Sequence, residues 1–319
     1  MPREGDAGFR EEMKVLLATQ KPFSAEAVAG IRDIVAGAGA ELAILERYES
    51  AGELKNAVAD ADALIVRSDK VDASVIAAAP GLRIIVRAGA GYDNIDLDAA
   101  SARRIVVMNT PGQNANAVAE LALAMMLYAA RNQFTPASGS EISGKTLGVL
   151  AFGNVGALVG AKARALGMKV RAYDPFLSAE RIEAAGAEAV GSIEELFASS
   201  DYLSLHIPAT PQTVGSIDYS LVSSLPAGAT LVNTARKEVV DEAGLLKALG
   251  ERADLKYVTD VAPDNLEELR KVAGLRVFAT PKKMGAQTAE ANLNAGLAAA
   301  RQIAAFFADG CTRFQVNKF

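Results

Sequence analysis

The stretch from Leu147 to Asp174 reads LGVLAFGNVGALVGAKARALGMKVRAYD, and it restricts the fold more than any other part of the sequence. A short apolar run ends in a turn with glycines at positions 153 and 156. A helical pattern follows, and a second apolar run, Val170 to Tyr173, ends on Asp174. This order of strand, tight turn, helix, strand and acid predicts a βαβ unit of the kind that binds dinucleotides.

Each part of such a unit has a physical role. Gly153 and Gly156 let the backbone approach a pyrophosphate, and the helix that begins near Val155 offers it free N–H groups and a positive dipole end. Asp174 lies 18 residues after Gly156, where a carboxylate accepts hydrogen bonds from ribose hydroxyls and repels a 2′-phosphate. We therefore expect NAD rather than NADP. Ala151 replaces the first glycine of the fingerprint, so a glycine-containing turn that binds no nucleotide is the alternative.

Composition sets the broad class. The chain has 319 residues, half of them hydrophobic, which is enough for about two domains with sizeable cores. No apolar run reaches the roughly 18 to 20 residues that a membrane helix needs, so no membrane partner is expected. Cys311 is the only cysteine, which favours a reducing, cytoplasmic location. A net charge of −5 argues against a nucleic-acid partner, and no metal site is predicted.

Short β-like runs alternate with helical patterns over nearly the whole sequence, which predicts an α/β fold with two doubly wound parallel sheets. The predicted strands of the first series are Lys14–Ala18, Glu41–Glu46, Ala63–Val66, Arg83–Arg87 and Ile105–Met108. Those of the second are Thr146–Ala151, Val170–Tyr173, Glu188–Val190, Tyr202–His206, Thr230–Asn233, Tyr257–Asp260 and Leu275–Ala279. A long helix is predicted from Asn114 to Phe134 and another from Thr288 to Phe307, and the latter could pack on either domain.

Arginine follows a predicted buried strand at three places, in the segments Arg67-Ser68, Arg87-Ala88-Gly89-Ala90-Gly91 and Asn233-Thr234-Ala235-Arg236. A desolvated guanidinium is costly unless it pairs, and open α/β sheets place ligands at strand ends. Three such arginines in an acidic chain predict a cationic pocket for an anionic substrate. The glycine-rich run could present backbone N–H groups to a carboxylate. The alternative is that each arginine caps a helix or pairs with a local carboxylate.

Taken in order, Arg67-Ser68, RAGAGYDNID, Asn109-Thr110-Pro111, the Gly153 loop, LHIPATPQT, NTAR and TPKKMGAQTAEA resemble the D-2-hydroxyacid dehydrogenase family, and within it the 3-phosphoglycerate dehydrogenase branch. The resemblance runs from about Lys14 to the last residue. It implies an NAD-dependent enzyme that interconverts 3-phospho-D-glycerate and 3-phosphohydroxypyruvate in serine biosynthesis. It also implies a short form without a regulatory domain, and a homodimer formed through the Asn114–Phe134 region.

The resemblance further implies a Rossmann-type NAD domain over residues 109–288 and a flavodoxin-like substrate domain built from residues 13–108 and 289–319. Residues 1–12 are predicted to form a flexible tail. The substrate would meet Arg236 as its carboxylate clamp, together with Arg67, Ser68, Arg87 and the Gly89, Ala90 and Gly91 amides. The cofactor-binding residues implied are Gly153, Asn154, Val155, Gly156, Asp174, His206, Ile207, Thr234, Ala235, Arg236 and Asp260.

One departure from the family pattern concerns the acid/base. The family uses a histidine in TPHxGA, oriented by a glutamate, whereas this chain has TPKKMGAQT and Asn265 at the glutamate position. The only histidine, His206, lies in LHIP. Lys282 or Lys283 takes the place of the histidine, and a one-residue insertion leaves the register between them open.

Two interpretations follow. In the first, a lysine donates the proton, its pKa lowered by desolvation and by the neighbouring lysine and Arg236, so that no carboxylate partner is needed. In the second, the site is catalytically weak and the chain is an NAD-binding sensor or corepressor-like protein. The three arginines favour the first, since a sensor needs none of them. They also favour a phosphorylated acid, with a hydroxypyruvate or glyoxylate reductase as the alternative.

Overall fold

The computed structural model describes residues 13–319, which divide into two compact units. Unit 1 contains residues 13–114 and 288–319, and unit 2 contains residues 115–287. The predicted tail, residues 1–12, lies outside the described residues. None of the helices in residues 13–319 is both long and apolar enough to cross a membrane.

Unit 1 is a five-stranded parallel sheet with strand order β2-β1-β3-β4-β5. This is the flavodoxin-like order, in which the chain changes direction across the sheet between β1 and β3. The strands are β1 (Met13–Thr19), β2 (Ala40–Glu46), β3 (Ala63–Val66), β4 (Ile84–Arg87) and β5 (Val106–Asn109). The helices are α1 (Ala25–Gly37), α2 (Ala51–Val58), α3 (Ala73–Ala77), α4 (Leu97–Ala102) and α12 (Ala289–Asp309).

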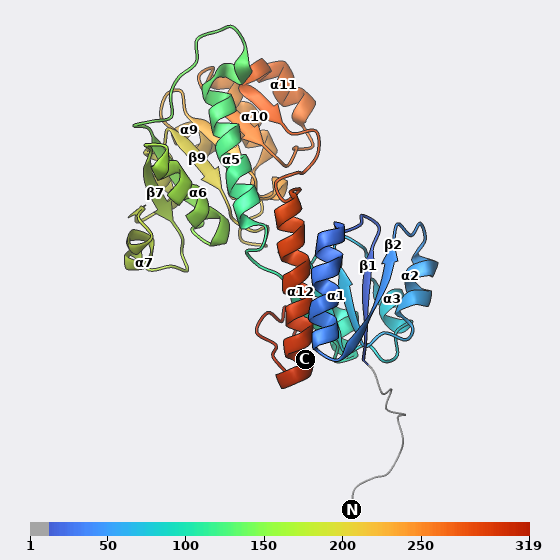
Figure 1. The fold of residues 1–319 in the computed structure, drawn as a ribbon. Coiled ribbons are helices and arrows are strands. Elements are labelled where there is room, and N and C mark those ends of the chain that lie inside the picture. Colours follow the sequence, from blue (N-terminus) through green and yellow to red (C-terminus); the bar gives the residue numbers. More distant parts are fainter. Residues whose placement is uncertain (1–12) are drawn as a thin grey trace, which may run out of the picture. The chain divides into compact units, whose positions relative to one another are not determined.

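Helices cover both faces of this sheet. The long α12 lies beside α1, and the apolar side chains of both helices pack on one face (Figure 1). The other face packs against α2, α3 and α4, so the strands are buried on both sides, as parallel strands usually are. Thr288 begins α12 by accepting a hydrogen bond from the N–H of Ala291, and Gly310 ends it in the left-handed conformation.

Unit 2 is a seven-stranded parallel sheet with strand order β12-β11-β10-β9-β6-β7-β8, the Rossmann order with one added strand. Its strands are β6 (Thr146–Leu150), β7 (Lys169–Tyr173), β8 (Glu188–Ala189), β9 (Tyr202–Leu205), β10 (Thr230–Asn233), β11 (Lys256–Thr259) and β12 (Val277–Ala279). Its helices are α5 (Ala115–Ala130), α6 (Asn154–Ala165), α7 (Ala179–Ala184), α8 (Ile193–Ala198), α9 (Tyr219–Ser224), α10 (Glu242–Glu251) and α11 (Leu266–Ala273), with short 3₁₀ turns η1 (Asn132–Phe134), η2 (Lys237–Val239) and η3 (Gly274–Arg276).

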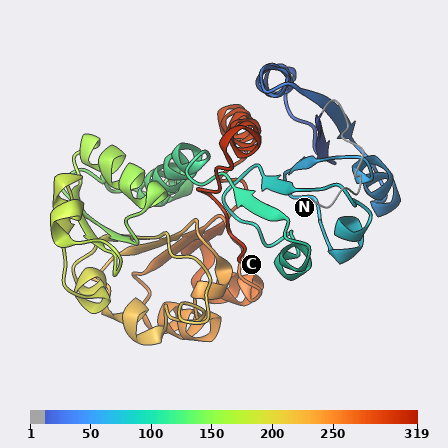
Figure 2. The ribbon, with the colours of Figure 1, turned by 90° about the horizontal axis from the view of Figure 1, so that it is seen from below.

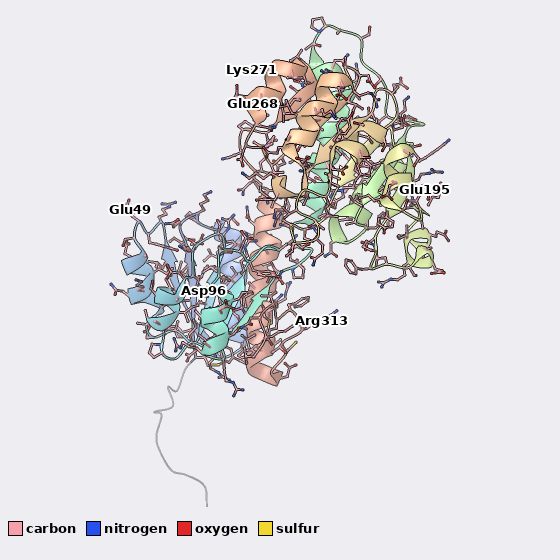
Figure 3. The ribbon with its side chains drawn as sticks, turned by 180° about the vertical axis from the view of Figure 1, so that it is seen from behind. Glu49, Asp96, Glu195, Glu268, Lys271 and Arg313 are labelled. Carbon is pink, nitrogen blue, oxygen red and sulfur yellow. The ribbon has the colours of Figure 1, made fainter. Side chains whose placement is uncertain are left out.

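The sheet of unit 2 lies between two helical layers (Figure 2). One apolar core forms under α5 and α6, and a second forms under α8, α9, α10 and α11. Polar side chains such as Glu195, Glu268 and Lys271 lie on the outer surface of these helices (Figure 3). The two sheets confirm the predicted α/β class with two doubly wound domains.

All twelve predicted strands are present, with ends that shift by at most two residues. The predicted helix from Asn114 to Phe134 ends early, at Ala130. Asn132, Gln133 and Phe134 follow it with positive φ angles of 47°, 56° and 58°, which no right-handed helix contains. The last helix extends two residues beyond the predicted Phe307, to Asp309.

Candidate active site

The strand register of unit 2 places the predicted cofactor residues in one row. Leu150 pairs with Tyr173 and Leu205, Leu205 with Asn233, Asn233 with Thr259, and Thr259 with Ala279. The residues that follow these strand ends are therefore neighbours at the carboxyl edge of the sheet: Ala151, Asp174, His206, Thr234, Asp260 and Thr280. The point at which the strand order reverses, between β6 and β9, lies within this row, where open α/β sheets bind ligands.

The loop from Ala151 to Gly156 has the geometry of a nucleotide-binding turn. Ala151 has a φ of 70°, the left-handed conformation that a glycine adopts without strain. A Cβ on Gly156 would lie 2.2 Å from the Ala151 carbonyl oxygen, so only glycine allows this approach of helix and strand. A Cβ on Gly153 would meet nothing within 4 Å. Packing within the protein therefore does not require a glycine at position 153. The open space beside Gly153 suits a pyrophosphate that lies close to the backbone and to the N-terminus of α6.

Asp174 follows β7, and its carboxylate accepts two backbone hydrogen bonds. The N–H of Phe152 donates to Oδ2 at 2.8 Å, and the N–H of Phe176 donates to Oδ1 at 2.9 Å. These bonds fix the carboxylate beside the nucleotide loop. Each oxygen can accept a further bond, so the carboxylate can still receive two ribose hydroxyls.

His206 directly follows β9 and is held from two sides. The backbone N–H of His206 donates to the Leu150 carbonyl at 2.9 Å. Its ring Nε2 lies 2.9 Å from the Ser204 hydroxyl. Burial lowers the pKa of His206 to about 4. The imidazole is therefore neutral at pH 7 and is unsuited to act as the proton donor there. Ile207 continues the same strand end and packs at the edge of the apolar core.

Asn233 shapes the turn that carries Arg236. Its side chain is fully buried, accepts from the N–H of Ala235 at 2.9 Å and donates to the Arg236 carbonyl at 2.9 Å. Arg236 Nη1 donates to the Ala235 carbonyl, and the guanidinium forms no salt bridge within residues 13–319. The Thr234 hydroxyl is buried and has no partner in the described part of the chain. A ligand group at this edge of the sheet would satisfy it, so the row fits a nicotinamide dinucleotide.

Lys282 and Lys283 lie in the segment between β12 and α12, and a buried carboxylate holds that segment. Asp260 accepts hydrogen bonds from the Thr280 hydroxyl and from the N–H groups of Met284 and Gly285. Asn265, at the position expected for a glutamate, donates instead to Glu242 on α10. Lys237 Nζ pairs with Asp264 at 2.5 Å, a link between the η2 turn and the α11 loop that the sequence alone did not indicate.

Unit 1 holds the other two predicted arginines, at the carboxyl ends of β3 and β4. The register pairs Val66 with Ala18 and with Arg87, so Arg67 follows in the next row beside Thr19 and Ala88. Arg87 Nε donates to the Arg67 carbonyl at 2.9 Å, and the Asn94 amide donates to the same carbonyl at 3.3 Å. Arg67 and Arg87 are therefore neighbours at one edge of the sheet.

The Arg67 guanidinium is held by a backbone carbonyl, a side-chain amide oxygen and an aromatic ring. It donates to the Lys21 carbonyl at 2.9 Å and to Asn292 Oδ1 at 2.5 Å, and it lies 5.0 Å from the centre of the Phe23 ring. It forms no salt bridge within residues 13–319, and burial lowers its pKa. The nearby Asp69 carboxylate raises that pKa in turn, so Asp69 acts on the Arg67 charge electrostatically without forming a salt bridge with it. No sequence motif pointed to Phe23 or to Asn292, which lies far along the chain.

The glycine-rich run after Arg87 makes room for that side chain. Gly89 has a φ of 151°, and a Cβ there would lie 1.4 Å from Arg87 Nη1. The Asn109 amide donates to the Ala90 carbonyl, which ties the run to the end of β5. Ser68, Ala90 and Gly91 lie at this same edge, with Ser68 and Ala90 exposed. The predicted substrate residues 67, 68, 87 and 89–91 thus gather at one edge of unit 1.

Residues 97–281, more than half of the chain, match the D-isomer specific 2-hydroxyacid dehydrogenase NAD binding domain. The chain belongs to this family. A solved structure of an NAD⁺-bound 3-phosphoglycerate dehydrogenase from Entamoeba histolytica is 48% identical, with a TM-score of 0.87, and the alignment covers 97% of this chain and 99% of that one.

Curated relatives have two different names. The D-3-phosphoglycerate dehydrogenase of Mycobacterium tuberculosis is 41% identical over 268 residues, which are 79% of this chain and 50% of that protein. The hydroxypyruvate reductase of Thermotoga maritima is 37% identical over 276 residues, 81% of this chain and 88% of that protein. The chain spans about half the length of the mycobacterial phosphoglycerate dehydrogenases that it matches.

The two glycines of the nucleotide loop give opposite predictions. Gly156→Ala forces a Cβ against the Ala151 carbonyl and is expected to lower the free energy of unfolding by ~1–3 kcal/mol. Gly153→Ala is expected to change it by less than about 1 kcal/mol, the usual range at a helix N-cap. The Gly153 variant should instead weaken NADH binding at least about tenfold, or ~1.4 kcal/mol. Urea unfolding and fluorescence titration with NADH measure the two effects. Equal NADH affinity in wild type and Gly153→Ala would contradict the assignment of this loop.

His206 makes stability depend on pH. Its pKa falls from 6.5 to about 4 on folding, so between these values the unfolded chain binds a proton that the folded chain does not. Stability is therefore lost as the pH falls through this window, by at most ~3 kcal/mol and by less where water reaches the ring. His206→Asn should lack this component. The free energies of unfolding of both proteins, measured at pH 7 and pH 4.5, test it, and parallel pH dependences would refute it.

Proposed function

We propose that the chain is an NAD-dependent oxidoreductase that interconverts 3-phospho-D-glycerate and 3-phosphohydroxypyruvate, the first step of phosphorylated serine biosynthesis. The observation that carries this proposal is the charge at the edge of unit 1, where Arg67 and Arg87 are neighbours and Arg67 forms no salt bridge within residues 13–319. A substrate with one carboxylate needs one arginine clamp. Two further arginines suit a second, phosphate group.

In this proposal Arg236 binds the substrate carboxylate and the oxygen of the reacting carbonyl, and Arg67 and Arg87 bind the phosphate. Bound NAD supplies or accepts the hydride. The nucleotide loop at Gly153 holds the pyrophosphate, Asp174 receives the ribose hydroxyls, and Thr234 and Ile207 lie beside the nicotinamide half. A 2′-phosphate would lie against the fixed Asp174 carboxylate, so NAD is preferred to NADP.

In this proposal a lysine donates the proton to the substrate oxygen and accepts it in the reverse reaction. As the keto carbon is reduced, its oxygen gains negative charge and takes a proton, which the ammonium of Lys282 or Lys283 donates. In the oxidative direction the neutral amine accepts the proton from the hydroxyl. We do not assign this role to His206, because burial lowers its pKa and its Nε2 is hydrogen-bonded to the Ser204 hydroxyl. General acid–base catalysis contributes roughly 10²- to 10⁴-fold, which sets the loss expected when the lysine is removed.

NADH oxidation with phosphohydroxypyruvate tests the proposal. Wild type, Lys282→Ala, Lys283→Ala and the double variant are compared between about pH 6 and about pH 10. We expect turnover by the wild type and a loss of ~10²- to 10⁴-fold in the double variant. Lys271→Ala, a lysine exposed on α11 (Figure 3), is the matched control and should retain activity.

The other functions make different predictions in the same assay. Equal kcat/KM for hydroxypyruvate and phosphohydroxypyruvate would contradict the phosphate site and favour a hydroxypyruvate reductase. Tight NADH binding without turnover of either acid would favour the sensor interpretation. Comparable kcat/KM with NADPH would contradict the role of Asp174. Full activity in the double lysine variant would remove the lysine from the mechanism.

We also propose that the active form is a homodimer in a reducing, cytoplasmic compartment. An apolar groove of ≈ 460 Å³ runs along α5 in unit 2 and has almost no polar atoms. It is lined by Leu121, Ala124, Met125, Leu127, Tyr128, Phe134, Phe278, Thr280, Pro281 and Met284. Phe134 is 74% exposed at this groove, and such apolar surfaces mark protein contacts. The groove lies in the region that the sequence predicts for the dimer, so a second copy of the chain is its proposed occupant.

Leu127→Glu is expected to convert the dimer to single chains, because it places a charge in the apolar groove. Leu166→Glu, at another exposed leucine of unit 2, is the matched control and should leave the dimer intact. Sedimentation velocity distinguishes the two masses. A wild type that sediments as one chain at all concentrations would exclude the dimer.

A further inference from the structure

The carboxylate of Asp260 is buried at the end of β11 and is surrounded by donors from a single segment. Asp260 is 1% exposed. Oδ1 accepts from the Thr280 hydroxyl at 2.8 Å and from the Met284 N–H at 2.9 Å. Oδ2 accepts from the Gly285 N–H at 2.8 Å, with the Met284 N–H at 3.1 Å. A buried carboxylate is stable only with such bonds, and bonds to a charged acceptor are the strong ones.

These bonds close the segment from Thr280 to Gly285, which we name the lysine loop, into a ring. The donors stand at the two ends of the lysine loop, and Lys282 and Lys283 lie between them. The Thr280 hydroxyl also lies 3.0 Å from the Lys282 carbonyl oxygen, which folds the loop inward. A Cβ on Gly285 would lie 3.0 Å from Asp260 Oδ2, so the glycine permits the close approach of the backbone. One side chain therefore fixes the backbone on both sides of the lysines.

Asn265 does not share this task. Its backbone N–H and its side-chain amide both donate to Glu242 of α10. The position from which the family's glutamate would orient an acid/base is thus tied to another helix in this chain. Among the hydrogen bonds of residues 13–319, those of Asp260 are the ones that link the sheet to the lysine loop on both sides of the lysines.

We propose that Asp260 is the positioning residue of the lysine acid/base, acting through the backbone of the lysine loop rather than through contact with the reacting atoms. This inference rests on the proposed lysine mechanism. It also differs from the role in nicotinamide binding that the family resemblance implies for Asp260, because both carboxylate oxygens already serve the lysine loop.

Asp260→Asn tests the proposal, since it keeps the size of the side chain and replaces one acceptor by an NH₂ group that must face a backbone N–H. We expect kcat for phosphohydroxypyruvate to fall by ~10²-fold, the usual cost of misplacing a catalytic group by about 1 Å. The affinity for NADH should stay near that of the wild type. In the Lys282→Ala, Lys283→Ala background the same substitution should cost almost nothing, since groups that act as a unit are not additive.

Hydrogen exchange measures the loop itself. The Met284 and Gly285 amides donate to Asp260, so Asp260→Asn should speed their exchange while the β-strands of unit 2 keep their protection. Thr280→Val is a second variant that removes one donor and leaves the carboxylate in place, and it should shift kcat and exchange in the same direction by less. Thr230→Val, at a buried threonine at the amino end of β10, is its matched control and should change neither.

Three results would overturn the proposal. They are unchanged exchange of residues 284 and 285 in Asp260→Asn, a loss of NADH affinity with kcat retained, and a kcat loss that is as large without the two lysines as with them. If the wild type does not turn over phosphohydroxypyruvate, the proposed function fails, and the exchange data alone then decide whether Asp260 holds the lysine loop.

Discussion

The parallel pairing of strands is the constraint from which the chemistry follows. Because every strand of a sheet runs in the same direction, each strand end delivers its next residue to one edge. In unit 2 the register aligns Leu150, Tyr173, Leu205, Asn233, Thr259 and Ala279, so Asp174, His206, Thr234 and Asp260 follow as neighbours. In unit 1 the same rule brings Arg67 and Arg87 together. Residues far apart in the sequence become neighbours without any special loop.

At these edges, the charged side chains form hydrogen bonds with backbone groups more than ion pairs. Arg67 donates to a carbonyl and to Asn292, and Asp174 and Asp260 accept from backbone N–H groups. An ion pair would neutralise the charge of such a side chain, whereas a peptide group orients the side chain and leaves its net charge in place. The Thr234 hydroxyl at the same edge is buried and has no hydrogen-bond partner within residues 13–319.

Much of this was predictable from the sequence, because buried parallel strands are short apolar runs that end in polar residues. The strand ends, the nucleotide loop and the arginines of NTAR and RAGAGYDNID were recognised in that way. Alanine can replace the first glycine of the fingerprint here because Ala151 adopts the left-handed backbone conformation that the turn requires. The partners of Arg67 could not be found, since Phe23 and Asn292 approach it only through folding. The role that we propose for Asp260 was also hidden, because a sequence does not show which N–H groups turn toward a carboxylate.

The most direct test of hydride transfer by this chain follows the hydrogen itself. The full chain is incubated with phosphohydroxypyruvate and NADH deuterated at the transferable position of the nicotinamide C4, and the product is examined by NMR. We expect 3-phosphoglycerate of D configuration that carries the deuterium on its second carbon. A chain that binds the deuterated NADH but leaves phosphohydroxypyruvate unreduced would contradict it.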